Sequence, residues 1–299
     1  MVLVAFIIVI IIWSTTPLSI QWSSQDVGFL FAVTARMTIG ALGCLALLAL
    51  QKRRLPMHKA AIKTYVAASL GVYVAMLSVY WGAQFIPSGL VSVLFGLTPI
   101  VTAVMAAYWL GEDSLGMGKL LGAILGVFGI SIIFQADMVL QNQAYLGVAG
   151  VLFAVLIHCA SAIWVKRIGN RMPALELTTG SLLFSAPMYL LTWYLVDGHW
   201  PPVISLKSGM AIMYLGIMGS VVGFTFYFYV LKHYPANRVA LLTFVTPVLA
   251  LLIGHTLNHE QIPMEVVYGA SFIMSALLLH QFGDRLLNKG VKWVRGVAD

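Results

Sequence analysis

The sequence predicts an all-α polytopic membrane protein whose ten transmembrane helices form two inverted five-helix repeats. Three observations predict this fold: the composition, an internal repeat and a one-sided distribution of basic residues. Of the 299 residues, 61% are hydrophobic and only 9% are charged, and the mean hydropathy is +0.94. A soluble domain carries about 25% charged residues. So much apolar surface therefore excludes a water-soluble fold and predicts a chain that lies in lipid.

The internal repeat joins residues 87–112 to residues 235–260. A shift of 148 residues, without a gap, superimposes an initial proline, a central Thr-Pro pair and a final glutamate. The matching residues are Pro87 and Pro235, Thr98–Pro99 and Thr246–Pro247, and Glu112 and Glu260. Each copy is apolar around its central proline, which predicts a bent or broken membrane helix. We place the first repeat at residues 1–137 and the second at residues 138–299.

Ten segments are long and apolar enough to span a bilayer, which takes about 20 residues. The connections between them are short, so the sequence leaves no room for a soluble domain. The ten predicted spans are residues 2–20, 28–50, 62–84, 88–110, 115–134, 145–165, 174–196, 208–231, 236–257 and 264–283.

The basic residues predict the orientation. With the N-terminus in the cytoplasm, 15 of the 17 Lys and Arg residues fall in cytoplasmic connections or the cytoplasmic C-terminal segment, as the positive-inside rule requires. Lys207 would lie outside and Arg36 within a span. Both termini are therefore expected in the cytoplasm. Because each repeat has five spans, an odd number, the two copies must lie upside down relative to each other, which is typical of secondary transporters.

Several other functions are excluded by the sequence. The excess of basic residues is a topology signal, so we expect no nucleic-acid partner. Cys44 and Cys159 lie in apolar runs without metal-ligand spacing. The sequence contains no phosphate-binding loop. An intramembrane enzyme built on His158 and Ser161 would lack an acid or a second base. We expect neither enzymatic activity nor a cofactor or metal.

A further set of features has the pattern of a known superfamily. These features are the Trp13–Thr15 step, Arg36 early in the second span, the central prolines, the Leu110–Glu112 ending and the glycine-rich fifth span. The chain resembles the EamA type of the drug/metabolite transporter superfamily over nearly its whole length. In the second copy, Leu257–Glu260 replaces the Leu-Gly-Glu ending.

This resemblance implies the location of the site and the type of activity. Members of the superfamily move amino acids, other small metabolites or drugs, mostly outward across the bacterial inner membrane. The resemblance also implies a central cavity between the repeats, formed largely by spans 1, 3, 4, 6, 8 and 9.

The two central prolines are the predicted hinges. Pro99 and Pro247 have no N–H, so the carbonyls of Phe95 and Thr243 lose their helical donors. An unsatisfied carbonyl is costly in lipid. Each proline is therefore either a hinge beside a polar cavity or a fixed kink whose carbonyl is covered by the preceding threonine.

His158 is an ionisable residue near the middle of a span, about 13 residues into the sixth. Such residues usually face an interior or water, and histidine titrates near neutral pH. If transport is coupled to protons, His158 is the best candidate for the coupling group. Otherwise the protein is a facilitator or an exchanger, and His158 is a neutral packing residue. Arg36 either binds a substrate carboxylate or ties helices together through carbonyls, and the second reading is favoured.

Aromatic and amide side chains are concentrated on the helices of the expected cavity. Aromatic faces with a few polar groups suit an amphipathic organic solute, including a cationic one. The alternative is that several of these side chains only pack or lie at the membrane interface. The predicted cavity residues are Trp13, Tyr80, Trp81, Gln84, Phe95, Thr98, His158, Trp164, Tyr227 and Thr243.

Two other groups are given structural or gating roles. Gly118, Gly122 and Gly126 form a small-residue face that favours close helix packing, either between spans 5 and 10 or in a dimer. Glu112 and Glu260, at matching helix ends, are predicted gate or cap residues. Whether the protein is a monomer or a homodimer stays open.

Taken together, these residues predict a secondary transporter that exports small organic metabolites, amino acids or related compounds, by alternating access. The alternative function is efflux of drugs and cationic compounds. The expected partners are a small-molecule substrate and the lipid bilayer, and the expected location is the bacterial inner membrane.

Overall fold

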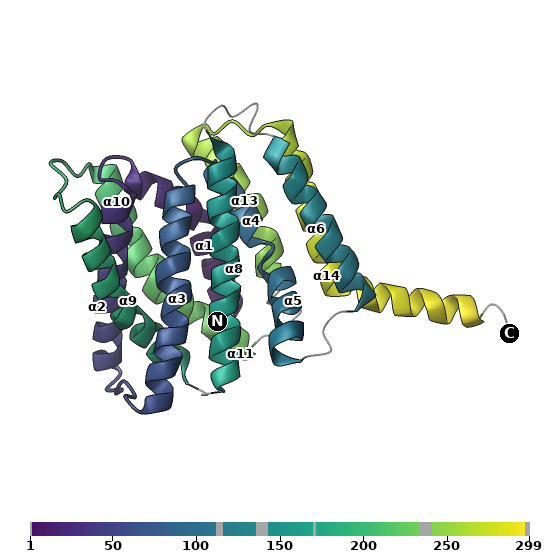
Figure 1. The fold of residues 1–299 in the computed structure, drawn as a ribbon, viewed down its shortest axis with the longest axis horizontal. Helices are drawn as coiled ribbons and strands as arrows, with labels where there is room; N and C mark the ends of the chain where they lie inside the picture. Colours follow the sequence, from purple (N-terminus) through teal and green to yellow (C-terminus); the bar gives the residue numbers. More distant parts are fainter. Residues whose placement is uncertain (1, 112–115, 136–142, 170–171, 234–240, 297–299) are drawn as a thin grey trace.

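The computed structural model describes residues 2–111, 116–135, 143–169, 172–233 and 241–296, and every regular element in these ranges is helical (Figure 1). Helices satisfy all backbone polar groups within one segment, as a bilayer requires. The elements are α1 (Val2–Ser24), α2 (Phe29–Leu50), α3 (Lys59–Gly82), α4 (Ser88–Phe95), α5 (Thr98–Leu110), α6 (Met117–Gln135), α8 (Ala144–Ile168), α9 (Ala174–Val196), α10 (Leu206–Tyr214), the π-helix η1 (Leu215–Val222), α11 (Gly223–His233), α13 (Leu241–Asn258) and α14 (Met264–Gly296).

These elements confirm the predicted fold class. Eight segments in the described ranges are long and apolar enough to cross a membrane, counting α4–α5 as one segment and α10–η1–α11 as another. The other two predicted spans fall on α9 and on the shorter apolar helix α13. α1 and α3 end, and α4 begins, at one end of the bundle, the upper end in Figure 1, which we call the Gln25 end. The opposite end is the Arg53 end.

Helix pairing follows the twofold relation expected of two inverted repeats. The third span (α3) packs against the sixth (α8). The repeat relates this pair to the eighth span (α10–η1–α11) and the first (α1), and these two also pack against each other. Three further pairs map onto themselves: α2 with α9, α4 with α13, and α6 with α14. Each half therefore buries its apolar faces mainly against the other half.

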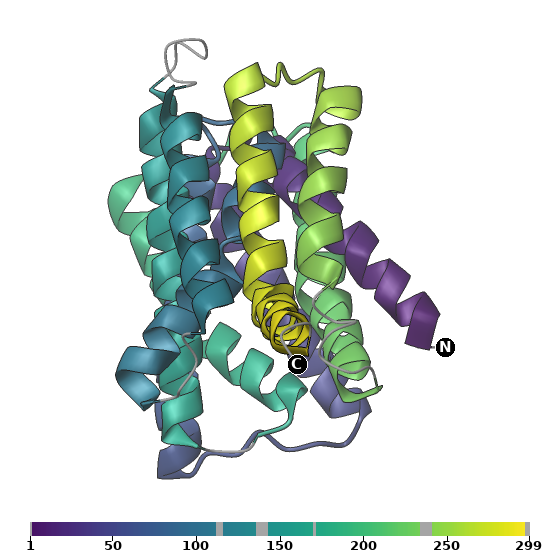
Figure 2. The same ribbon diagram turned by 90° about the vertical axis from the view of Figure 1, so that its right-hand side faces the viewer.

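Glycines determine how closely α6 and α14 approach. A β-carbon on Gly122 would lie 2.7 Å from the carbonyl oxygen of Ala276, and one on Gly129 would lie 2.8 Å from that of Gly269. Only glycine leaves room for such close contact. The predicted packing of spans 5 and 10 is confirmed, and Figure 2 shows α14 in yellow beside α6.

The predicted bend or break of the fourth span is an interruption at Gly96 and Leu97, between α4 and α5. Two other local features were not predicted. The eighth span contains η1, and π-helical turns are rare and often occur at functional sites. The last helix, α14, continues to Gly296 and leaves the bundle at the Arg53 end (Figure 1).

Candidate functional site

The interruption of the fourth span lies against α8. Pro99 is in the first turn of α5 and removes the donor for the Phe95 carbonyl. The Thr98 hydroxyl donates to that carbonyl at 2.6 Å, so the backbone oxygen is satisfied. The Cys159 thiol donates to the Thr98 carbonyl at 3.6 Å, which attaches α8 to the break. The backbone carbonyls of Phe95 and Thr98 at the break therefore both accept hydrogen bonds.

The equivalent proline in the second repeat has a different setting. Pro247 is buried inside α13, which runs without interruption from Leu241 to Asn258. The Thr246 hydroxyl donates to the Leu242 carbonyl at 2.7 Å. The two copies of one sequence pattern therefore have different helix geometries, broken in α4–α5 and continuous in α13. Thr243 lies half-buried in α13.

His158 is exposed, on the side of α8 that faces Phe95 of α4 and Gly71 of α3. The exposed apolar residues Phe153 and Leu156 are on the other side of this helix. They precede His158 by five and two residues, and side chains at these separations point in roughly opposite directions because an α-helix turns by about 100° per residue. Its imidazole contacts the half-buried Phe95 ring, with ring centroids 6.1 Å apart at an interplanar angle of 65°. The structure thus brings His158, Phe95 and Thr98 together at the break.

A second predicted pair lies between α1 and α11. The rings of Trp13 and Tyr227 have centroids 4.8 Å apart. Both side chains are half-buried, and they flank a small apolar cluster that includes Val9, Val230 and Leu242. This pair is separate from the His158 group.

The remaining predicted aromatics lie in several different places. Tyr80 is fully buried in α3. Trp81 packs over Gly150 of α8, and the exposed Gln84 donates to the Trp81 carbonyl at 3.2 Å. Trp164 is 45% exposed, on the side of α8 that carries Phe153 and Leu156. Glu112 lies outside the described residues.

A polar crevice of about 260 Å³ opens at the Gln25 end between α1 and α3. Gln21 fixes the backbone beside it by donating to the carbonyls of Ala83 at 3.2 Å and Ile86 at 2.7 Å. The lining residues are Ile20, Gln21, Ser24, Gln25, Tyr80, Ala83 and Gln84.

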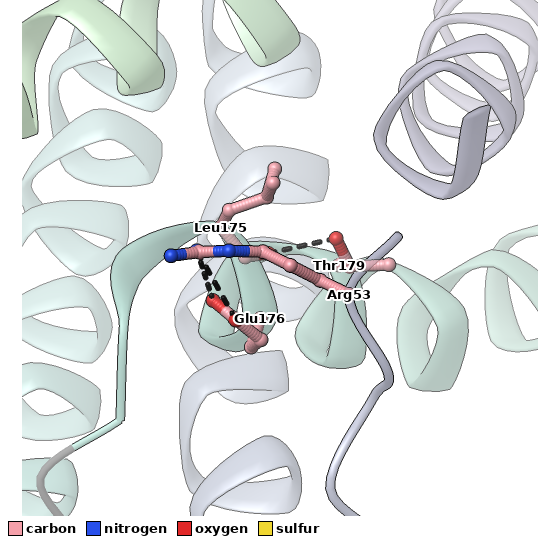
Figure 3. A network of polar contacts seen from close by, with 4 residues as sticks. All are labelled: Arg53, Leu175, Glu176 and Thr179. Carbon is pink, nitrogen blue, oxygen red and sulfur yellow. Dashed lines mark hydrogen bonds and ion pairs between the residues drawn. The ribbon is translucent and has the colours of Figure 1, made fainter. Parts of the chain in front are cut away.

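A second crevice, of about 190 Å³, lies at the Arg53 end between α2, α9 and η1. Arg53 lines it and forms an ion pair with Glu176 in the first turn of α9, with nitrogen and oxygen 3.2 Å apart (Figure 3). A carboxylate near a helix N-terminus is favoured by the helix dipole. Besides Arg53, the lining includes Cys44, Thr178, Ser220 and Thr225.

Glu260 anchors a network at the Gln25 end, which we call the Glu260 network (Gln21, Trp22, Ser88, Asn258 and Glu260). The Glu260 carboxylate accepts the Ser88 N–H at the start of α4 at 2.9 Å and the Asn258 amide at 3.0 Å. Asn258 also accepts from the Trp22 indole at 2.9 Å and donates to Gln21 at 3.4 Å. These bonds tie α1, α4 and α13 together.

Sequence reasoning missed several of these residues. Gln21, Asn258 and Ser220 are ordinary polar residues in the sequence, and only their partners from distant spans make them informative. Among the described residues, no group of three or more His, Cys, Asp or Glu side chains is placed to hold a metal ion.

Comparison with known proteins identifies the family. The profile of the EamA-like transporter family matches residues 1–135 and 145–280, one match in each repeat. The chain belongs to the EamA-like transporter family. This is a family of membrane transporters and not of enzymes.

Individual relatives of this EamA-like transporter are distant. It is 25% identical over 283 residues to "Uncharacterized transporter YoaV" of Bacillus subtilis (strain 168), covering 94% of this chain and 97% of the relative. It is 27% identical over 207 residues to "Probable amino-acid metabolite efflux pump" of Escherichia coli (strain K12), covering 67% and 69%. A solved structure titled "Crystal structure of protein" has a TM-score of 0.66 at 18% identity, covering 95% and 98% of the two chains, which supports the fold alone.

Proposed function

We propose that this EamA-like transporter exports small organic metabolites, amino acids or related compounds, by alternating access. The observation that carries the proposal is the similarity to relatives from two bacteria that are named "Probable amino-acid metabolite efflux pump", at 27% and 26% identity. The two crevices, one at each end of the bundle, support a route through the protein. Inverted repeats are suited to alternating access because two related halves can exchange conformations.

The proposed location is the bacterial inner membrane, with the Arg53 end and both termini in the cytoplasm. This orientation rests on the 15 of 17 basic residues that it places on the cytoplasmic side. The Gln25 end then faces the outside. The Glu260 network would close that outer end in the conformation described here.

The proposed substrate path runs between the halves near the break in the fourth span. His158, Phe95 and Thr98 would line one part of it and Trp13 and Tyr227 another. Pro99 and Pro247 are the proposed hinges. The exposed position of Trp164 and the packing of Trp81 on Gly150 make these two side chains weaker candidates for substrate contact.

One experiment tests this function directly. The purified full-length chain is reconstituted in liposomes and screened for flux of labelled amino acids, nucleosides and cationic drugs. We expect amino-acid flux several-fold above that of protein-free liposomes. The tilted Trp13–Tyr227 pair also suits flat cationic solutes. Flux of cationic drugs without amino-acid flux would replace the proposal with drug efflux.

A further inference from the structure

Arg36 is a buried cation in the second span. It lies in α2 with 6% of its surface exposed. Within the described part of the chain, no acidic side chain forms an ion pair with it. A charge in such surroundings is costly unless it is paired. Ionisable residues inside membrane spans often mark the path of a substrate or an ion.

The hydrogen bonds of Arg36 are incomplete. Its Nη1 donates to the Tyr80 hydroxyl at 3.4 Å, a long bond, and its guanidinium carbon lies 5.8 Å from the centre of the Tyr80 ring. Its Nε is buried and has no hydrogen-bond partner. A guanidinium has five N–H donors in a planar fork, so this one retains capacity for a further acceptor.

Glycine in η1 leaves space beside the guanidinium. A β-carbon on Gly219 would lie 3.5 Å from Arg36 Nη2. The glycine therefore borders the charged group with no side chain of its own. Because η1 is π-helical, its backbone is already displaced from regular α geometry at this point.

The surroundings of Arg36 connect the two crevices. Tyr80, its hydrogen-bond partner, lines the crevice at the Gln25 end. Ser220, the residue after Gly219, lines the crevice at the Arg53 end. The guanidinium thus lies between residues that belong to opposite access routes, as a central substrate site requires.

We propose that Arg36 and Tyr80 bind the carboxylate of the transported substrate, an inference that rests on the proposed export function. A guanidinium binds a carboxylate through two parallel N–H bonds. The substrate would bring the missing negative charge into the span and would use the free Nε donor. The same buried positive charge disfavours cationic substrates without an acid group. The substrate class is therefore small organic carboxylates, amino acids included.

The test compares an amino acid with its carboxamide, which has the same side chain and amino group but no carboxylate. Flux of both compounds is measured in liposomes with the wild-type protein and with Arg36→Gln, Arg36→Lys and Tyr80→Phe. We expect wild type to prefer the acid by about tenfold or more, the scale of one lost charge pair. Arg36→Gln should lose this preference, Arg36→Lys should retain part of it, and Tyr80→Phe should weaken it.

The control is Lys207→Gln, which removes an exposed positive charge at the Gln25 end and should leave the preference unchanged. If Arg36→Gln does not fold, the wild-type ratio and Tyr80→Phe still decide the question. Equal flux of acid and amide in wild type, or an unchanged preference in a folded Arg36→Gln, would overturn this inference but not the proposed function. Absence of any amino-acid flux would overturn both.

Discussion

Among single residues, Arg36 and His158 are two ionisable side chains in apolar spans, and their surroundings differ. His158 is exposed in α8 and has an aromatic neighbour, Phe95. Arg36 is buried and bonded to Tyr80. An accessible imidazole can exchange protons, whereas a guanidinium keeps its charge. The two residues therefore suit different tasks, proton coupling and charge recognition.

We expect His158→Gln to remove any stimulation of transport by a pH gradient. A gradient of one pH unit shifts substrate accumulation about tenfold when one proton is exchanged per substrate. Glutamine keeps polarity but cannot titrate, so the variant should transport equally with and without the gradient. His199→Gln is the matched control, because that side chain is 90% exposed beside Asp197. Wild-type flux that ignores the gradient would instead identify a facilitator or an exchanger.

The sequence identified both residues but could not show which of them is better placed for a role in transport. A charged or titratable group in an apolar run is visible without a structure. Its partners are not: Tyr80 lies 44 residues from Arg36 in the chain, and the contact depends on how α2, α3 and η1 pack. The sequence favoured a helix-tying role for Arg36, whereas its unpaired Nε supports substrate binding.

At the scale of elements, the fourth span is the most informative helix. Its proline was predicted to bend or break it, and the structure shows a break between α4 and α5. The alternative that the preceding threonine covers the orphaned carbonyl is also supported, through the bond from Thr98 to the Phe95 carbonyl. A covered carbonyl satisfies the backbone and still leaves an interruption in the helical hydrogen-bond ladder where motion can concentrate.

We expect Pro99→Ala to insert normally and to reduce flux several-fold. The alanine N–H can donate to the Phe95 carbonyl, which would repair the helix at the break and remove the hinge. Adding Pro247→Ala should reduce flux further. Pro187→Ala is the control, since Pro187 lies within the continuous helix α9. Flux and thermal stability in detergent are measured together, and unchanged flux in a stable double variant would exclude the hinges.

Element positions follow closely from the apolar runs, because bilayer thickness fixes the length of a span. The sequence could not show that the two proline-containing spans differ, since α4–α5 and α13 share the same motif. Nor could it show η1, because a π-helical turn depends on packing against α2. These differences arise from tertiary contacts and not from local preference.

For the whole molecule, the twofold pairing of helices coexists with a local asymmetry. The pairs α3 with α8 and α1 with α10–η1–α11 obey the repeat, while the proline-containing spans depart from it. Two copies of one pattern in two geometries are what alternating access between inverted repeats requires. The Glu260 network lies at the end where α4 begins, so under the proposed function it would hold that end closed.

The Glu260 network carries the last prediction. Glutamine at this position keeps the shape but loses the charge. One oxygen can still accept the Ser88 N–H, while the new amide nitrogen can no longer accept from Asn258. A hydrogen bond to a charged group is worth about 1.5–3 kcal/mol, so Glu260→Gln should increase opening of the Gln25 end by about tenfold or more.

Opening at this end is measured by thiol labelling. Cys44 and Cys159 are both buried, so a cysteine introduced at Val91, which is 3% exposed in α4, can serve as the reporter. Its reaction with a membrane-impermeant reagent should accelerate in Glu260→Gln. It should not accelerate in Glu265→Gln, which removes a carboxylate from the first turn of α14 outside the network. Equal labelling rates in Glu260→Gln and wild type would mean that the network stabilises the fold without closing the outer end. The proposed hinges at Pro99 and Pro247 would then need another contact to hold that end shut.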